Sequence, residues 1–395
     1  MLNKNNIIKR RIIKDLYFSD ALSCADLSKS NGKSVPLITK LLNELIEEGK
    51  VMETGLAAST GGRRPQMYSI KQELMYVIAV AMDQLVTRIV LLDMRNNYVS
   101  QVKSFALTLT DNPNSLKELT NHIEDFISQC GVPENKIAGI GIGMPGLVDV
   151  NKGINLLFLK PEKGSSVVSY IQSKTSIPVV IDNDSGLIAL AELKLGIARG
   201  KKNVMVLNIG WGIGLGVIVQ GELFKGANGF AGEFSHIPLF DNGKKCSCGK
   251  TGCLQTETSL LVVAEKAIKG LNEGRQSKLA GISIDEVEAA TKAIMEAALL
   301  GDQFAIELLS EAGYHIGRGI SVLIHVLNPE LIVLSGRGSV AGSIWITPVQ
   351  QAIADHSLAA IAENTKVKIS SLRYDAELIG AAALVMDKYD LLPVL

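Results

Sequence analysis

The sequence contains few cysteines and few histidines, five of each in 395 residues. An odd number of cysteines, three of them within residues 246–253, does not fit the disulfide framework of a secreted protein. No run of about 18 or more uncharged apolar residues is present, so the sequence predicts no transmembrane helix. The basic first residues lack the apolar stretch and cleavage site of a signal peptide. We therefore expect a cytoplasmic protein that makes no contact with a membrane.

The sequence also lacks net charge, with 40 basic and 40 acidic residues, which argues against a uniformly basic nucleic-acid-binding protein. It has no repeat period and no low-complexity linker. Its length and its 47% apolar content predict two or three domains. The charge is uneven, because residues 1–70 carry eleven Lys and Arg against seven Asp and Glu. Taken alone, this excess is a weak indication of phosphate contact.

The first 50 residues have the pattern of a helix-turn-helix unit. Apolar residues at helical spacing in 7–17 predict a first helix whose basic residues face mostly outward. Ser23 and Asp26 have capping-box spacing at the start of a short helix, which Asn31-Gly32 ends. A longer helix then runs from Ser34 to Gly49.

In helix-turn-helix units the N-terminal residues of the second helix enter the DNA major groove. The exposed residues that we expect to contact DNA there are Lys33, Ser34, Val35, Thr39, Lys40 and Asn43.

The segment "VMETGLAASTGGRRPQMYSI", residues 51–70, predicts two strands joined by a glycine-rich tip, which is the wing of a winged helix. Arg63 and Arg64 would place two guanidinium groups along a phosphate backbone or in the minor groove. The alternative is a three-helix bundle used for protein contact. The helix-turn-helix order together with a basic wing favours DNA binding.

From about residue 75 onward, short β-rich apolar runs alternate with helical stretches, which predicts an α/β fold of two lobes with a cleft. Asn183 and Asp184 follow the strand "IPVVIDND", where a carboxylate can accept a proton or a hydrogen bond from a hydroxyl group. Their alternative role is a strand-end turn and helix cap. The alternating glycines of "NIGWGIGLG" do not have the spacing of a phosphate-binding loop.

Residues 236–253, "HIPLFDNGKKCSCGKTGC", combine one histidine with three cysteines. His236, Cys246, Cys248 and Cys253 form the Cys₃His set typical of structural zinc. Gly249 and Gly252 allow the backbone to fold Cys253 back toward the other ligands. Four protein ligands leave no position for a substrate water, so we expect a structural Zn²⁺ ion rather than hydrolase chemistry. The alternative is a loop of free thiols.

Together these segments resemble the ROK family of sugar kinases and transcriptional repressors. The resemblance covers essentially the whole chain, and the zinc loop with its histidine is its most specific part. The segments that carry it are "GGRRP", "GIGMPGLVD", "IDNDSG", "AGEFSHI", "CSCGKTGCLQT", "LNPELIVLSG" and "YDAELIGAAAL".

The resemblance implies two actin/hexokinase-like (ribonuclease H-like) α/β lobes around a sugar cleft, preceded by a winged helix-turn-helix. The domains would be residues 1–72 for DNA binding, 73–190 for the first lobe, and 191–395 for the second lobe with the zinc loop. A C-terminal helix can return to the first lobe in this arrangement.

The same resemblance places Asn183, Asp184, Glu233, His236 and Gln255 at sugar-binding positions. Asp184 corresponds to the general base of the kinases. His236 would direct one ring nitrogen toward zinc and the other toward a sugar hydroxyl.

The sequence departs from the kinases at both phosphate-binding motifs. Residues 81–85, Ala-Met-Asp-Gln-Leu, replace Asp-x-Gly-Gly-Thr, and Trp211 replaces the threonine of Gly-Thr-Gly. Phosphoryl transfer depends on positioning and neutralising the phosphates, so we expect Asp184 to be a remnant base in a protein without kinase activity.

Other departures concern the ligand. Gly186, Ser235 and Gln255 stand where many relatives have asparagine, glycine and glutamate, and Lys160 lies near a position that is often a sugar-binding asparagine. Lys160 would favour an acidic or phosphorylated sugar if it faced the site, although a solvent-facing lysine is the commoner case.

The sequence therefore predicts a repressor of carbohydrate-utilisation genes that binds operator DNA as a homodimer or dimer of dimers. Its effector would be a sugar or sugar phosphate. The enzyme alternative is an ATP-dependent sugar kinase resembling glucokinase, and regulation by a protein partner is a third possibility.

Overall fold

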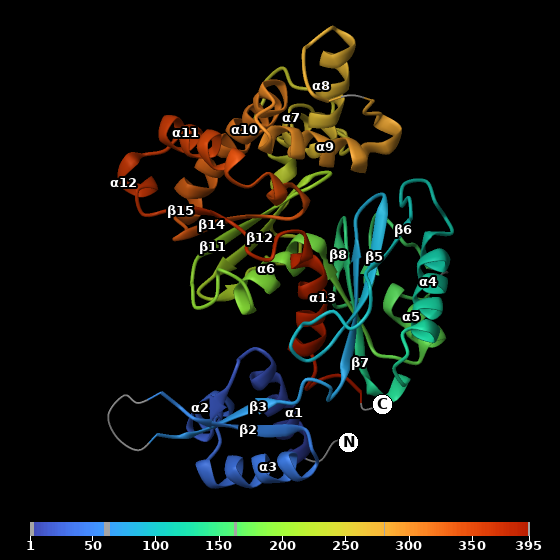
Figure 1. Ribbon diagram of the computed structural model, residues 1–395, viewed down its shortest axis with the longest axis vertical. Coiled ribbons are helices and arrows are strands. Elements are labelled where there is room, and N and C mark those ends of the chain that lie inside the picture. Colours follow the sequence, from blue (N-terminus) through green and yellow to red (C-terminus); the bar gives the residue numbers. More distant parts are fainter. Residues whose placement is uncertain (1–3, 59–63, 162–163, 280, 394–395) are drawn as a thin grey trace. The chain divides into compact units, whose positions relative to one another are not determined.

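The computed structural model describes residues 4–58, 64–161, 164–279 and 281–393. The chain divides into two units, of which the first comprises Met1–Asp182 and Ala381–Leu395 and the second comprises Asn183–Gly380. Figure 1 shows helices and β-sheets in both units. The α/β class expected from the sequence is confirmed.

The N-terminal helices follow the predicted spacing and capping. α1 (Lys4–Tyr17) buries its apolar stripe, and α2 (Cys24–Asn31) begins with a capping box formed by Ser23 and Asp26. Gly32 ends α2 with a φ of 59°, a left-handed conformation that suits glycine. α3 (Val35–Glu47) follows, with Ser34 at its N-cap position, where the serine side chain makes no capping hydrogen bond.

A small antiparallel sheet completes this domain. Its strands are β1 (Leu22–Ser23), β2 (Val51–Leu56) and β3 (Gln66–Ile70), in the order β1-β3-β2. The hairpin of β2 and β3 follows directly after α3, which confirms the predicted winged helix-turn-helix. Arg63, at the predicted tip of the wing, lies outside the described residues.

Several basic side chains of α1 are paired with carboxylates, and among them Lys9 and Lys14 are less exposed than the sequence predicts while Arg11 is exposed. Lys9 pairs with Glu44 at 2.7 Å and Glu48 at 2.6 Å. Arg11 pairs with Asp390 at 3.1 Å, and Lys14 pairs with Asp387 at 3.2 Å. Asp387 and Asp390, which lie outside residues 1–70, thus offset part of the basic excess of that segment. The sequence shows no sign of this pairing, because its partners are far apart in the chain.

Arg10 extends the same junction between α1 and the last residues of the chain. Its guanidinium donates a hydrogen bond of 2.6 Å to the carbonyl of Leu392 and lies 4.3 Å from the centre of the Tyr389 ring. Burial raises the pKa of Tyr389 although the nearby Arg10 charge lowers it. The C-terminal segment therefore packs against the first helix of the winged helix.

Each unit contains a five-stranded sheet, and the two sheets have the same strand order. The first sheet is β10-β7-β4-β5-β6, and the second is β15-β14-β11-β12-β13. In both, three strands form an antiparallel meander and the first of these also pairs in parallel with a later strand. The strands of the first sheet are β4 (Tyr76–Met82), β5 (Val86–Leu92), β6 (Lys103–Ala106), β7 (Ile137–Met144) and β10 (Val179–Asn183). Those of the second are β11 (Val204–Ile209), β12 (Ile213–Val219), β13 (Glu222–Leu223), β14 (Leu331–Ser335) and β15 (Lys366–Ile369).

The remaining elements cover these sheets or connect their strands. In the first unit they are α4 (Ser115–Gln129), η1 (Glu134–Lys136), α5 (Val167–Thr175) and the short pair β8 (Val148–Asp149) and β9 (Ile154–Asn155). In the second unit they are α6 (Asp184–Lys194), η2 (Phe234–His236), α7 (Gln255–Thr258), α8 (Leu260–Asn272), η3 (Ile284–Glu286), α9 (Val287–Leu299), α10 (Gln303–Leu327), η4 (Arg337–Ile344), α11 (Ile346–His356), α12 (Ala359–Ala362) and η5 (Arg373–Asp375).

The last helix, α13 (Ala376–Asp387), begins in the second unit and ends in the first. Its apolar residues are almost all buried. In the first unit it packs against β7 at Gly141, where a side-chain carbon would overlap the carbonyl oxygen of Ala381. A glycine inside a strand loses more conformational entropy on folding than other residues. The close approach of the α13 backbone therefore explains why residue 141 is a glycine.

We expect Gly141→Ala to lower the free energy of unfolding by about 1–3 kcal/mol, because the added methyl group has to displace the backbone of α13. Thermal and denaturant unfolding of both proteins measures the change. Gly210→Ala is the matched control, since the nearest atom to its new methyl group, apart from its chain neighbours, lies 3.8 Å away. Equal stability of Gly141→Ala and the unaltered protein would contradict this packing.

Candidate functional site

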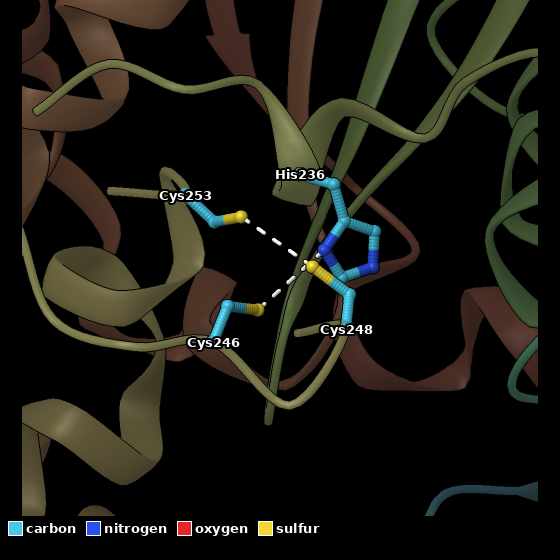
Figure 2. Close-up of side chains that lie close together, drawn as sticks. All are labelled: His236, Cys246, Cys248 and Cys253. Atoms are coloured by element: carbon cyan, nitrogen blue, oxygen red, sulfur yellow. Dashed lines mark hydrogen bonds between the residues drawn. The ribbon is translucent and has the colours of Figure 1, made fainter. Parts of the chain in front are cut away.

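The three clustered cysteines and His236 converge in the second unit. His236 ends the short helix η2, and the cysteines lie on the loop that leads to α7. Backbone hydrogen bonds fold this loop on itself, including Leu239 N–H to the Gly252 carbonyl at 2.8 Å and Cys246 N–H to the Lys250 carbonyl at 2.8 Å. Figure 2 shows the four side chains directed toward a common centre.

The distances within this cluster fit a single tetrahedral metal ion. The ligand atoms of His236, Cys246, Cys248 and Cys253 all lie within 4.8 Å of one another. Sγ of Cys248 is 3.6 Å from Sγ of Cys253, and Sγ of Cys246 is 3.6 Å from Nδ1 of His236. Zinc–ligand bond lengths in a tetrahedron require separations of about 3.8 Å between sulfurs and about 3.6 Å between sulfur and nitrogen. The four residues can therefore hold a metal ion.

The cysteines of this cluster strongly affect one another's pKa. Burial opposes ionisation of Cys246, but the Cys248 backbone N–H, the Gln255 amide, and the Cys248 and His236 side chains outweigh it and lower the pKa to about 6. Burial and the two neighbouring cysteines raise the pKa of Cys253 to about 12. Several thiolates so close together repel one another, and a divalent cation removes this repulsion.

His236 has its two ring nitrogens near different neighbours. Nδ1 faces the thiols, while Nε2 lies 4.0 Å from a carboxylate oxygen of Glu233, which directly precedes η2. The Glu233 side chain is about half exposed, and burial of the rest raises its pKa, with the His236 charge acting in the opposite direction. The ring thus joins the thiol cluster to an accessible carboxylate.

Gln255 begins α7 and belongs to the same group of residues. Its side-chain N–H donates to Sγ of Cys246 at 3.1 Å. The resemblance implies that Gln255 contacts a sugar hydroxyl; in the structure one N–H of its amide is directed at a thiol, and the sugar contact stays a prediction. A glutamate here would bring a negative charge to that sulfur, so glutamine suits a thiolate neighbour better.

Asn183 and Asp184 meet at the start of α6. Asn183 Oδ1 accepts hydrogen bonds from the backbone N–H groups of Ser185 at 3.0 Å and Gly186 at 3.2 Å, so it caps the helix. Asp184 Oδ1 accepts a hydrogen bond of 2.7 Å from the Ser185 N–H. The cap that we considered as the alternative role is present, and it fixes the direction of both side chains.

Asn208 is a residue of this site that sequence reasoning missed. It lies near the end of β11 and donates to Oδ2 of Asp184 at 3.3 Å and to Oγ of Ser185 at 3.2 Å. In the sequence its segment is distinguished only by the alternating glycines that follow it. Because the contact joins residues 24 positions apart, a motif could not reveal it.

The alternating glycines after Asn208 allow close helix packing. Side-chain carbons at Gly214 and Gly216 of β12 would overlap Ser185 and Ala189 of α6. The glycines thereby let α6 lie directly on the sheet and bring Asp184 near β11. This packing accounts for a spacing that matched no phosphate-binding fingerprint.

The segments that align with the kinase phosphate motifs have other contacts. Asp83 Oδ1 accepts the backbone N–H groups of Leu85 at 2.8 Å and Val86 at 2.7 Å, which closes the turn between β4 and β5 with a carboxylate. In the second unit the guanidinium of Arg337 lies 4.7 Å from the Trp211 ring and 4.5 Å from the Tyr374 ring. Arg337 also pairs with Glu288. A stacked, nearly buried arginine therefore occupies the surroundings of Trp211.

The residues expected to contact DNA lie on α3 and next to it. Ser34, Val35, Thr39, Lys40 and Asn43 are exposed, and Lys33 is partly exposed.

On the wing, Arg64 donates hydrogen bonds to the carbonyls of Ala57 at 2.6 Å and Leu56 at 3.4 Å. Lys160, in the first unit, is exposed. No helix among the described residues is both long and apolar enough to cross a membrane.

The repeated sheets define an α/β protein of the actin and hexokinase fold class, here with a winged helix before it. The chain belongs to the ROK family, whose sequence pattern matches residues 78–388. A solved ROK family transcriptional regulator, a homolog of the E. coli MLC protein, superposes with a TM-score of 0.78 at 27% identity, covering 98% of this chain and 97% of that one.

Two curated relatives represent the two alternatives considered for this chain, a repressor and a sugar kinase. The xylose repressor of Caldicellulosiruptor bescii is 28% identical over 384 residues, 96% of this chain and 95% of that protein. The glucokinase of Halalkalibacterium halodurans is 33% identical over 259 residues, 64% of this chain and 77% of the glucokinase. The repressor thus matches the chain almost from end to end, and the kinase matches about two thirds of it.

We expect the purified protein to contain one divalent metal ion per chain, which elemental analysis measures. Cys248→Ser removes one of four ligands at an exposed position, so it should lower the metal content to well under half an ion without unfolding the protein. Cys130→Ser, outside the cluster, is the control and should retain the metal. Full metal content in Cys248→Ser would show that this cysteine is not a ligand.

Proposed function

We propose that the protein is a sugar-responsive transcriptional repressor of carbohydrate-utilisation genes. One observation carries the proposal: a winged helix-turn-helix precedes a ROK domain in a single chain, as the near end-to-end similarity to a xylose repressor also supports. Lys33, Ser34, Val35, Thr39, Lys40 and Asn43 would contact operator DNA, with Arg63 and Arg64 on the wing. The protein would act in the cytoplasm as a homodimer or dimer of dimers.

The effector in this proposal is a sugar or sugar phosphate held by Asn183, Asp184, Glu233, His236 and Gln255. Asp184 would accept a hydrogen bond from a sugar hydroxyl, held in direction by the Asn208 amide and the start of α6. His236 would offer Nε2 to the sugar, because Nδ1 faces the thiols. These donors and acceptors suit hydroxyl groups better than apolar ligands.

The metal in the proposal is zinc, bound by His236, Cys246, Cys248 and Cys253. A closed Cys₃His site supplies structure rather than catalysis, because it has no open coordination position. Fixing Nδ1 of His236 would fix the plane of the ring, and so the position of Nε2 on the other side. The hydrogen bond from Gln255 to Cys246 would support the same arrangement.

Effector binding can release DNA only if it favours the conformation that binds DNA less well. α13 offers a covalent route for this coupling, since it runs from the second unit into the first. The residues after it hold α1 through Arg10, Arg11 and Lys14. A change in α13 would therefore reach the support of the DNA-binding domain.

The contacts of Asp83 and Arg337 support a protein without kinase activity. The β4–β5 turn presents a carboxylate, which repels phosphates, and its N–H groups at Leu85 and Val86 are already bonded to it. Near Trp211, the Arg337 guanidinium is stacked on two rings and paired with Glu288. The β4–β5 turn thus lacks the free N–H groups at Leu85 and Val86 that a phosphate loop would require there.

DNA binding predicts that Arg63→Ala combined with Arg64→Ala weakens affinity for all duplexes. The negative slope of log K against log salt concentration should become shallower by about 2, because two phosphate contacts are lost. Fluorescence anisotropy at several salt concentrations measures it. Lys269→Ala with Lys292→Ala, which removes two exposed lysines of α8 and α9, is the matched control. An unchanged slope in the wing variant would exclude the wing from DNA contact.

The sensor proposal predicts that a sugar or sugar phosphate from a thermal-shift panel stabilises the protein by about 2.7 kcal/mol at a hundredfold excess over its Kd. Asp184→Asn and the metal-depleted Cys248→Ser should reduce this shift.

A coupled assay for ADP release with the same sugars should show no turnover above background. Robust turnover would instead establish the kinase alternative, and no response to any sugar would favour control by a protein partner.

A further inference from the structure

The first half of α3 exposes an unusual side-chain stripe. Val35, the first residue of the helix, is 48% exposed, although the opposite face of α3 is buried. Thr39 and Asn43 follow at intervals of four residues and are exposed as well. Residues four apart lie on one face of a helix, so the three side chains form a single stripe.

The hydroxyl group of Thr39 already has hydrogen-bond partners within the protein. Its hydroxyl donates to the Val35 carbonyl at 3.0 Å and lies 3.2 Å from Sγ of Cys24 in α2. The methyl group is therefore the part of the side chain left for a partner. Val35 has only methyl groups to offer, so Val35 and Thr39 together present a small apolar surface on a helix proposed to contact DNA.

The distribution of charged residues along α3 determines which half of the helix can approach DNA. No acidic residue lies between Asp26 and Glu44, while Lys33 and Lys40 flank the stripe. Glu44 and Glu48, near the end of the helix, are paired with Lys9 at 2.7 and 2.6 Å. The N-terminal half, which carries Val35 and Thr39, is thus the half that duplex DNA can accommodate.

The major groove contains one apolar group, the 5-methyl of thymine, and apolar side chains contact it in sequence-specific complexes. Four residues of helix span roughly 6 Å, close to two base-pair steps of about 3.4 Å each. Val35 and Thr39 can therefore reach thymines within two steps of each other. Asn43 lies one turn farther on, where an amide can pair with adenine.

We propose that Val35 and Thr39 determine operator specificity by contacting thymine 5-methyl groups in the major groove. This inference rests on the proposed function, since it requires that α3 binds duplex DNA. It assigns readout of thymine methyl groups to these two residues and leaves general affinity to Lys33, Lys40 and the wing.

The test uses the full-length, metal-containing protein and an operator selected from random duplexes. Each thymine of the operator is replaced in turn by deoxyuridine, which pairs identically but lacks the methyl group. Affinity should fall about fourfold at one or two positions of each half-site, the effect of one buried methyl group. All other replacements should leave affinity unchanged.

Two variants test which residue contacts the thymine at each sensitive operator position. Val35→Ala removes methyl groups, and Thr39→Ser removes the methyl group but keeps the hydroxyl that bonds to Val35. Each variant should lose about fourfold affinity for the thymine operator and lose its sensitivity to deoxyuridine at one position. Each should bind the corresponding deoxyuridine operator as well as the unaltered protein does, which also shows that the variant is folded. Lys40→Ala, the control, should weaken binding to every duplex while keeping the deoxyuridine pattern.

The outcomes separate this inference from the function on which it rests. If an operator is selected but no deoxyuridine replacement matters, or if the pattern persists in both variants, the thymine readout is wrong and DNA binding stands. If no duplex is enriched in the selection, the repressor function fails and the readout fails with it.

Discussion

The imidazole of His236 is the point on which the second unit's functional arrangement depends. Its Nδ1 faces three thiols and its Nε2 faces Glu233, so one rigid ring connects the metal-binding loop to the carboxylate beside it. The three cysteine sulfurs of this cluster lie within 4.8 Å of one another and of the ring nitrogen, and thiolates so close together repel one another. A cation bound among them would convert this repulsion into attraction and would give the ring a fixed plane. In the proposed function the cluster therefore supports a ligand site and takes no part in a reaction.

A second constraint comes from helices packed directly on sheets. Small residues in β12 let α6 approach so closely that Asp184, at its first turn, reaches Asn208 on β11. α13 approaches β7 at Gly141 in a similar way and continues to the segment that holds α1. In both units, therefore, a glycine in a strand sets how closely a helix backbone approaches its sheet.

Much of this architecture could be predicted from the sequence. Apolar spacing and capping residues such as Ser23 and Asp26 determine helices within a few residues of themselves, so the helix-turn-helix and wing were predictable. The Cys₃His set was also predictable, because its members lie within 18 residues and metal ligands have few other reasons to cluster. Pairing of α1 with the C-terminal segment was not, and neither were Asn208 and the stacking of Arg337, since each joins residues far apart in the chain.

The local elements, the cluster of one histidine and three cysteines, and the family could be inferred from sequence alone, because each depends on neighbouring residues or on a motif. Which side-chain groups are already hydrogen-bonded or paired depends on how the elements pack. Packing pairs Lys9 of α1 with Glu44, directs the Gln255 amide at Cys246, and lets the Thr39 hydroxyl donate to the carbonyl of Val35. The reason is physical: a side chain's type sets which bonds it can make, but the partners within about 3 Å of it decide which bonds it has left to offer.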